Sequence, residues 1–511
     1  MHHATERARP ATALTGMKES RLAELGIIGQ AVMGRNLALN ACEKGIPVAV
    51  YDREASLIQA ASDEAEGALP LIPATSLEEF LSLLERPRKI LFMIKAGKPV
   101  ENLLEEILPH LAPGDIVIDG GNSHYQDTAR RCTALKNRGI RFIGAGISGG
   151  EEGARSGPSI MPGGDESAWP LVAPILQALA AKSPRGTSCC SWIGRGGAGH
   201  FVKMIHNGIE YAEMQAIAEA YHLMKDLLGM SNQAMHEAVS LWTRGPLKSY
   251  LLEITASILI HPDSDGSPLL EKILDQAGQK GTGKWSVLEG LDRNVPLPSV
   301  GAAVCARQLS SLRSERCQAA DIFGRISATS SPASPGSLAK SEPASLLRDL
   351  EKALLANRVV TYAQGFEVIR VAAQQEQWQI DLAELARIWT RGCIIRTPLL
   401  EDIARACHAD PSQTNLLLTP PLAEILRDAS GGWRRLVAAG ISAEVPLPAL
   451  ASGLTFFDGY KSRTLPANLI QAMRDYFGAH LYQRKNDEPG KYHHTNWTGA
   501  GGAVSSSLYN A

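Results

Sequence analysis

The sequence lacks a run of apolar residues long enough for a membrane-spanning helix, which needs about 18 residues. Its N-terminal segment has no apolar core followed by a cleavage site, so we predict no secretory signal there. We interpret residues 1–20 as a flexible extension. Translation that starts at Met17 would equally leave this segment outside the fold. The alternative is a transit peptide, because the segment is rather rich in arginine.

An excess of charge of either sign is also absent. The chain has 51 Lys and Arg against 53 Asp and Glu, a net charge of -2, which argues against a general affinity for nucleic acid or an anionic membrane. Its eight cysteines form no C-x-x-C pair and have no metal-ligand spacing. We therefore predict no metal site built from these cysteines and interpret the thiols as reduced, mostly core residues of a cytoplasmic protein.

At 511 residues the chain is too long for a single core. Between Leu22 and Gly146, short apolar runs alternate with helix-like segments, and the runs predict five buried parallel strands: 22–29, 46–52, 89–95, 115–121 and 140–146. This alternation is typical of an α/β, Rossmann-like, doubly wound domain. We predict that this domain covers residues 21–196.

Strand signals end at the glycine cluster around Gly194–Gly197. Three later segments have the periodicity of long amphipathic helices: 200–228, 345–375 and 381–395. They predict a large all-α domain over residues 197–462. The Ser/Pro-rich stretch 326–343 predicts an exposed loop, and residues 463–511 predict an extended C-terminal tail too polar for a core of its own.

A glycine-rich turn, Gly29-Gln30-Ala31-Val32-Met33-Gly34, follows the first predicted strand and opens a helix. It is a G-x-G-x-x-G pattern with Ala31 in the second position. Glycines permit the tight turn, and the helix N-terminus then faces a pyrophosphate. We predict a dinucleotide site here. An ordinary glycine turn is the alternative.

The next predicted strand ends in Tyr51-Asp52-Arg53-Glu54. An acid at this place binds the ribose 2′-OH of NAD, whereas an arginine pairs with the 2′-phosphate of NADP. The chain supplies both, so this motif leaves the choice of cofactor open. Two later strands end in Lys95-Ala96-Gly97 and Gly120-Gly121-Asn122-Ser123, which we expect to line the nicotinamide half of the site.

A polar stripe runs along the segment 200–214. Lys203, His206, Asn207, Glu210 and Tyr211 fall at i, i+3, i+4, i+7 and i+8, which places all five on one face of a helix. Such a stripe is often a solvated face. Its amine, imidazole, amide, carboxylate and phenol are nevertheless the groups used in acid–base chemistry, so we predict a catalytic helix.

Two further glycine-rich loops have candidate ligand groups. Ser148-Gly149-Gly150 follows a predicted strand and can bind a carboxylate or hydroxyl, or be a plain turn towards Gly157. Residues 278–284 resemble a P-loop, but Trp285 stands where Mg²⁺ binding needs Ser or Thr, and a helix-like segment, 269–277, precedes the loop. We exclude nucleoside triphosphates. The candidate cations for a sugar phosphate are Lys280, Arg307, Arg474 and His480.

Together these motifs resemble the long-chain 6-phosphogluconate dehydrogenases from about Leu25 to the C-terminus. The matching segments are GxAVMGRNLALN, DGGNS, SGGEEGAR, GPSIMPGG, GHFVKMIHNGIEY, ILDQAGQKGTGKW, VTYAQGF, GCIIR, LPANLIQAMRDYFGAH and HTNWTG. The resemblance implies oxidative decarboxylation of 6-phosphogluconate to ribulose 5-phosphate and CO₂, with NADP as the cofactor and no metal.

The resemblance also implies residue roles. Lys203 is expected to be the general base and Glu210 the general acid. Expected substrate contacts are Asn122, Ser148, Gly149, Gly150, His206 and Asn207, with Tyr211, Lys280 and Arg307 on the phosphate. Expected cofactor contacts are Gly29, Ala31, Met33, Gly34, Asp52, Arg53, Lys95 and Asn122. Arg474 and His480 match residues that a partner subunit contributes, which implies a homodimer.

The chain departs from the family at Asp52-Arg53-Glu54, where members that use NADP usually carry Asn-Arg-Thr or Asn-Arg-Ser. Two carboxylates beside a 2′-phosphate would repel it, so NAD, or use of both cofactors, stays open beside NADP. Two rival functions are weaker. Another β-hydroxyacid dehydrogenase would lack GQKGTGKW and RDYFGAH, and an inactive, ligand-sensing relative would have lost Lys203 or Glu210.

Overall fold

The structure is a computed structural model that describes residues 22–324, 343–413 and 415–499. Packing divides the chain into two compact units, residues 1–200 with 391–393, and residues 201–390 with 394–511. The predicted extension 1–20 lies outside the described residues. So does the predicted loop 326–343, apart from Pro343, where a helix begins.

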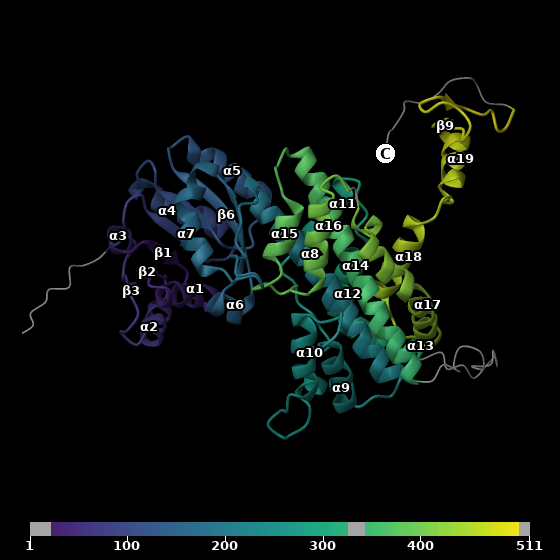
Figure 1. Cartoon of the computed structure of the whole chain (residues 1–511), viewed down its shortest axis with the longest axis horizontal. Helices are drawn as coiled ribbons and strands as arrows, with labels where there is room; N and C mark the ends of the chain where they lie inside the picture. Colours follow the sequence, from purple (N-terminus) through teal and green to yellow (C-terminus); the bar gives the residue numbers. More distant parts are fainter. Residues whose placement is uncertain (1–21, 325–342, 414, 500–511) are drawn as a thin grey trace, which may run out of the picture. The chain divides into compact units, whose positions relative to one another are not determined.

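The first unit alternates strands and helices (Figure 1). In chain order they are β1 (Leu25–Ile28), α1 (Val32–Glu43), β2 (Val48–Tyr51), α2 (Ala55–Glu64), β3 (Leu71–Pro73), α3 (Leu77–Ser82), β4 (Lys89–Phe92), α4 (Lys98–Ile107), β5 (Ile116–Asp119), α5 (Tyr125–Lys136), β6 (Arg141–Ser148), α6 (Gly150–Ser156), β7 (Ser159–Gly164), α7 (Trp169–Leu179) and β8 (Gly194–Arg195).

These strands form one sheet in the order β3-β2-β1-β4-β5-β6-β7-β8. Strands β1 to β6 pair in parallel, and β7 is antiparallel to β6. The five predicted strands are confirmed as β1, β2, β4, β5 and β6. The other three were not predicted, because β3 and β8 are very short and β7 contains Pro162 and two glycines, which are rare in strands.

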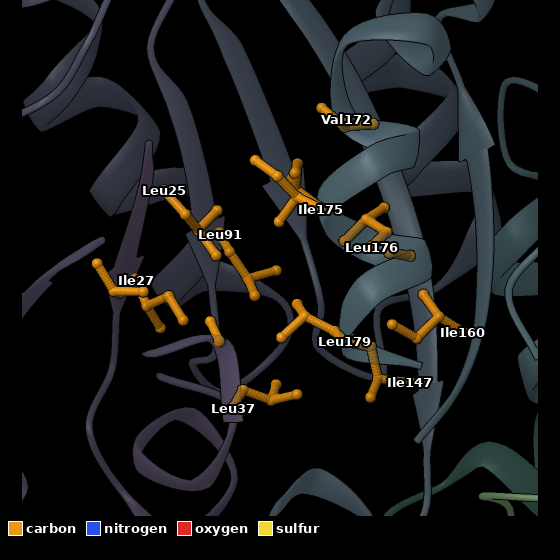
Figure 2. Close-up of a cluster of buried hydrophobic side chains, with 14 of the residues drawn as sticks. Leu25, Ile27, Leu37, Leu91, Ile147, Ile160, Val172, Ile175, Leu176 and Leu179 are labelled. Carbon is orange, nitrogen blue, oxygen red and sulfur yellow. The ribbon is translucent and has the colours of Figure 1, made fainter. Parts of the chain in front are cut away.

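Apolar layers cover both faces of the sheet. Leu91 of β4 points to the layer that holds Leu37 of α1 and Leu176 of α7 (Figure 2). Its neighbours Ile90 and Phe92 point to the other layer, which is filled from α3, α4 and α5. The doubly wound fold is therefore confirmed. The strand order places β1 beside β4. This is the topological switch point, where the strand order reverses and where such sheets bind ligands.

The second unit is largely helical, as predicted. Its elements, of which the first helix starts just before the division, are α8 (Ala198–His222), α9 (Asn232–Trp242), α10 (Tyr250–Ile260), α11 (Thr282–Asp292), α12 (Pro298–Ser311), α13 (Arg313–Phe323), α14 (Pro343–Gln375), α15 (Leu382–Ile388), α16 (Leu399–Ala409), α17 (Pro420–Ser442), α18 (Pro448–Tyr460), α19 (Ala467–Gly478), β9 (Tyr482–Gln483) and β10 (Tyr492–His493).

Helix α14 is a long central helix of this unit. It is about 50 Å long, at 1.5 Å per residue, and packs along α17 and α18. Buried polar groups join it to α8, where Glu213 accepts a hydrogen bond of 2.7 Å from Arg358 Nε. Arg358 also donates to Leu247 O and Ser249 Oγ. The inside of this unit thus contains a buried ion pair whose polar atoms are satisfied.

The helix expected at 269–277 is wrong. Only a short 3₁₀ turn, Leu269–Lys272, forms, and residues 273–280 have no regular structure. Ile273 and Leu274 are exposed. A segment of nine residues cannot hold a helix without packing one face against the protein, because isolated helices of that length are unstable.

Candidate active site

The turn between β1 and α1 contains two glycines at positions where the backbone is too close for any larger residue. Gly29 has a φ of +98°, and a Cβ there would lie 2.5 Å from Met93 O. A Cβ at Gly34 would lie 1.8 Å from Gly29 O. Helix α1 therefore starts directly behind β1, and its exposed first residues, Ala31 and Val32, present N–H groups that lack an acceptor within the helix. These donors fit the pyrophosphate of a dinucleotide.

The acidic and basic residues after β2 behave differently. The Asp52 carboxylate accepts hydrogen bonds from the backbone N–H of Gln30, at 2.6 Å, and of Glu54, at 3.0 Å. Arg53 instead points to α4, where its Nη2 lies 2.8 Å from Glu106 Oε2. Asp52 is thus fixed to the glycine-rich turn. Arg53 is held by a residue that the sequence analysis did not identify.

The segment Gly120–Ser123 is ordered by Asp119, the last residue of β5. Its carboxylate accepts hydrogen bonds from Ser123 Oγ at 2.6 Å and from the Gly121 N–H at 3.0 Å, and it pairs with buried Arg131 at 3.1 Å. Asn122 is exposed between these anchors. Lys95, which follows β4, is also exposed. Asp119 and Arg131 had not been predicted, since their partnership depends on the fold of α5 against the sheet.

Ser148 ends β6, and the glycines after it have a packing role. Gly149 has a φ of +152°, and a Cβ there would lie 2.7 Å from Gly392 O. The same carbonyl accepts the Ser159 N–H at 3.0 Å. The loop therefore holds residues 391–393 against the first unit. This packing supports the alternative that the loop is a structural turn. It is also compatible with a ligand bound by the Ser148 hydroxyl.

The polar stripe on α8 is buried. Lys203 is 6 % exposed and His206 0 % exposed, and Asn207 and Tyr211 are also buried. Only Glu210 reaches further out, with 22 % of its side chain exposed. The stripe is thus not a solvated face. The structure places these five predicted residues together at one buried surface of the second unit.

The electrostatics of the stripe favour an uncharged imidazole and a protonatable acid. Burial lowers the pKa of His206 well below its usual value, and the charge of Lys203 acts in the same direction. Burial raises the pKa of Glu210, although Lys203 and Arg307 oppose that shift. His206 Nδ1 lies 3.2 Å from Asn207 Oδ1 and 3.9 Å from Glu210 Oε2. A carboxyl with a raised pKa is suited to donate a proton near neutral pH.

A second group of predicted residues surrounds the start of α11. Asn207 Nδ2 donates to Thr282 Oγ1 at 3.4 Å, and a Cβ on Gly283 would meet the Tyr211 ring at 2.5 Å. The Arg307 guanidinium lies 3.6 Å from the centroid of that ring. Tyr211 and Arg307 therefore form one polar and cationic group beside the stripe. Lys280 is exposed on the loop before α11, and Gly278 O of that loop accepts a hydrogen bond from Arg307.

The C-terminal segment is organised around Asp475 of α19. Its buried carboxylate accepts hydrogen bonds from the Leu481 and Thr495 N–H groups and from Trp497 Nε1, and contacts His494 Nδ1 at 3.0 Å. The HTNW motif is therefore a structural anchor that the sequence analysis did not recognise. Of the predicted cations, Arg474 donates to Gln471, and the ring of His480 packs against Phe477.

A cavity of about 390 Å³ lies among α14, α15, α16 and the segment that follows α16. Its wall includes Phe366, whose ring packs against Trp389, and Trp389 in turn makes a T-shaped contact with the His206 ring. Lys203 and Glu210 do not line it.

Within residues 22–324, 343–413 and 415–499, no group of three or more His, Cys, Asp or Glu is arranged to hold a metal ion. In the same ranges, no helix is long and apolar enough to cross a membrane.

Two family descriptions match the chain. The NAD binding domain of 6-phosphogluconate dehydrogenase matches residues 24–194, and the C-terminal domain of 6-phosphogluconate dehydrogenase matches residues 199–497. The decarboxylating 6-phosphogluconate dehydrogenase of Treponema pallidum is 49% identical over 494 residues, covering 96% of this chain and 99% of that one. The Homo sapiens enzyme of the same name is 48% identical, with 96% of this chain and 99% of that protein covered.

A solved structure agrees with these relatives. The Plasmodium falciparum 6-phosphogluconate dehydrogenase, described in its apo form and in complex with NADP⁺ and with 6-phosphogluconate, superimposes with a TM-score of 0.87 at 37% identity. The alignment covers 93% of this chain and 100% of that structure. The match extends over both units, and it confirms the resemblance predicted from the motifs. The chain belongs to the 6-phosphogluconate dehydrogenase family.

Proposed function

We propose that the chain oxidises and decarboxylates 6-phosphogluconate, giving ribulose 5-phosphate and CO₂, with NADP or NAD as the hydride acceptor. The observation that supports this function best is the buried stripe on α8, which combines an amine with a carboxyl whose pKa is raised. The bound nicotinamide supplies the site that takes the hydride from C3 of the substrate. The protein supplies the proton transfers.

Lys203 and Glu210 have opposite tasks in this proposal. Lys203 takes the proton of the 3-hydroxyl as the hydride leaves C3, and the resulting 3-keto acid loses CO₂ because its carbonyl accepts the electron pair. Glu210 then gives a proton to C1 of the enediol. One proton is removed and one is returned, so the net change is the loss of a hydride and of CO₂.

The other predicted residues bind. The substrate carboxylate and hydroxyls are assigned to Asn122, Ser148, Gly149, Gly150, His206 and Asn207. The 6-phosphate is assigned to Tyr211, Lys280 and Arg307, a choice supported by the guanidinium stacked on the Tyr211 ring. The dinucleotide is assigned to Gly29, Ala31, Met33, Gly34, Asp52, Arg53, Lys95 and Asn122.

Initial rates on 6-phosphogluconate with NADP and with NAD test the reaction. Reduced cofactor and CO₂ should form in equal amounts. Reduced cofactor without CO₂ would contradict decarboxylation and favour a simple β-hydroxyacid dehydrogenase. No turnover with either cofactor would favour a ligand-sensing role.

We further propose a homodimer in which Arg474 and His480 complete the site of the partner subunit, with residues 463–511 as the segment that reaches across. Helix α19 supports this assembly. It carries exposed apolar side chains at i, i+1, i+4, i+7 and i+8, which share one face: Leu469, Ile470, Met473, Tyr476 and Phe477. An uncovered apolar face on this scale is typical of an interface. The eight free thiols agree with a reducing compartment, and we propose the cytoplasm.

Mixed dimers test the shared site. Lys203→Ala and Arg474→Ala should each inactivate the enzyme alone. In a mixed dimer one of the two sites receives both intact residues, so refolding the variants together at equal amounts should restore about a quarter of the parent activity. Restored activity would be absent if Arg474 served its own subunit. Sedimentation of the parent chain as a monomer would contradict the assembly itself.

A further inference from the structure

The turn after β2 places one guanidinium among several carboxylates. Arg53 Nη2 lies 2.8 Å from Glu106 Oε2, in the last turn of α4, 53 positions along the chain. Both groups are accessible, with 67 % of the Arg53 side chain and 45 % of the Glu106 side chain exposed. This ion pair lies beside the glycine-rich turn, because Asp52 is bonded to the Gln30 N–H.

Asp52 and Arg53 differ in how firmly they are held. Both oxygens of Asp52 accept backbone hydrogen bonds, from Gln30 and Glu54, so this carboxylate keeps its place. Arg53 has a long, largely exposed side chain and is held at its tip by Glu106. An exposed ion pair of this kind is weak and exchanges readily with other anions. Arg53 is therefore the movable member of the motif.

The surroundings of this arginine are acidic. Burial raises the pKa of Tyr51, the last residue of β2, and the nearby carboxylates of Glu106, Asp52 and Glu78 act in the same direction. Arg53 alone among the contributing charges opposes that shift. A doubly charged 2′-phosphate beside Tyr51 would meet these three carboxylates and the Arg53 guanidinium, which is already paired with Glu106.

We propose that Glu106 is a specificity-determining residue that lowers the preference of this chain for NADP over NAD, because its carboxylate competes with the 2′-phosphate for the Arg53 guanidinium. The proposal rests on the dinucleotide site assigned above. NAD, which carries a 2′-hydroxyl, leaves the Arg53–Glu106 pair intact and meets the fixed Asp52. NADP must break the pair before Arg53 can bind its phosphate.

Binding of two small probes isolates this effect from catalysis. Adenosine 2′,5′-bisphosphate and adenosine 5′-monophosphate differ only in the 2′-phosphate, and calorimetric titration of each onto the full-length enzyme gives its affinity. Glu106→Gln should bind the bisphosphate about threefold more tightly, since an exposed ion pair changes an equilibrium by at most a factor of about five. It should bind the monophosphate as before. The KM for NADP should likewise fall relative to the KM for NAD.

Two controls separate competition from a general change of charge. Glu105→Gln removes the same charge from the neighbouring exposed position of α4 and should leave both affinities unchanged. In an Arg53→Ala background, Glu106→Gln should lose its effect on the bisphosphate. The proposal is overturned if Glu105→Gln acts equally, if both probes tighten together, or if the effect persists without Arg53. Failure of the parent enzyme to bind either probe would overturn the dinucleotide site as well.

Discussion

Glu210 and Glu213 lie three residues apart on α8, and burial raises the pKa of both carboxyl groups. Their partners differ. Glu213 accepts a 2.7 Å hydrogen bond from Arg358, which itself is buried and fully engaged. The only ion contact of Glu210 within 4 Å, among the described residues, is His206 at 3.9 Å.

We interpret this difference as the one between a structural acid, Glu213, and the proposed catalytic acid, Glu210. A buried carboxylate with a close guanidinium gains little from taking up a proton, because the pair is already neutral as a whole. A buried carboxyl without such a donor can change its protonation state at small cost and is also free to face a substrate. Burial alone therefore does not distinguish the proposed catalytic acid from Glu213. The hydrogen-bond partners of the two carboxyl groups do.

Among the substitutions that test this comparison, replacement of Lys203 should have the largest effect, a loss of turnover. Lys203→Ala removes the proposed base and should lower kcat by about 10³-fold or more, since positioned acid–base groups contribute about 10²- to 10⁴-fold. The thermal unfolding midpoint should change little, and 6-phosphogluconate should still bind, which equilibrium binding would measure. Lys225→Ala is the control, because Lys225 follows on the same helical run but pairs with Glu271 near the surface. A near-normal rate in Lys203→Ala would refute the base assignment.

The structural acid is tested through its partner. Arg358→Met leaves Glu213 buried without its guanidinium and should lower the free energy of unfolding by about 3–5 kcal/mol. The midpoint in urea measures this loss. Arg370→Met, on the same helix, breaks the more exposed pair with Glu367 and should cost about 1 kcal/mol or less. Equal losses in the two variants would mean that the Arg358–Glu213 pair adds no more than a surface pair does.

The same distinction explains how much the sequence could predict. Local patterns were sufficient for the five apolar strands and for the α8 stripe, because a helix repeats its faces every 3.6 residues and a buried strand is a continuous apolar run. The stripe included Glu210 and left out Glu213, but it could not show how the buried Glu213 carboxylate is held. Its partner Arg358 lies 145 positions later, and no local pattern carries that information.

The same limit applies to the first unit. The motif Asp52-Arg53-Glu54 predicted a place where the cofactor is selected, but Glu106 comes close to Arg53 only when α4 packs beside the sheet. Asp119 and Arg131 are likewise brought together by the position of α5. The expected helix at 269–277 failed for a related reason, since its apolar residues found no surface to cover. Partners supplied by tertiary packing are what sequence patterns omit.

The smallest expected effect in this comparison, and the most specific, belongs to the proposed catalytic acid. Glu210→Gln should lower kcat by about 10²-fold, because an amide cannot give up the proton that C1 requires. In the parent enzyme the acid must be protonated, so kcat should fall as the pH rises through the raised pKa of Glu210. This alkaline decline should disappear from the pH profile of Glu210→Gln. Glu213→Gln should retain the decline, since its partner Arg358 keeps that site out of the chemistry, and an identical change in both variants would contradict the distinction between the two acids.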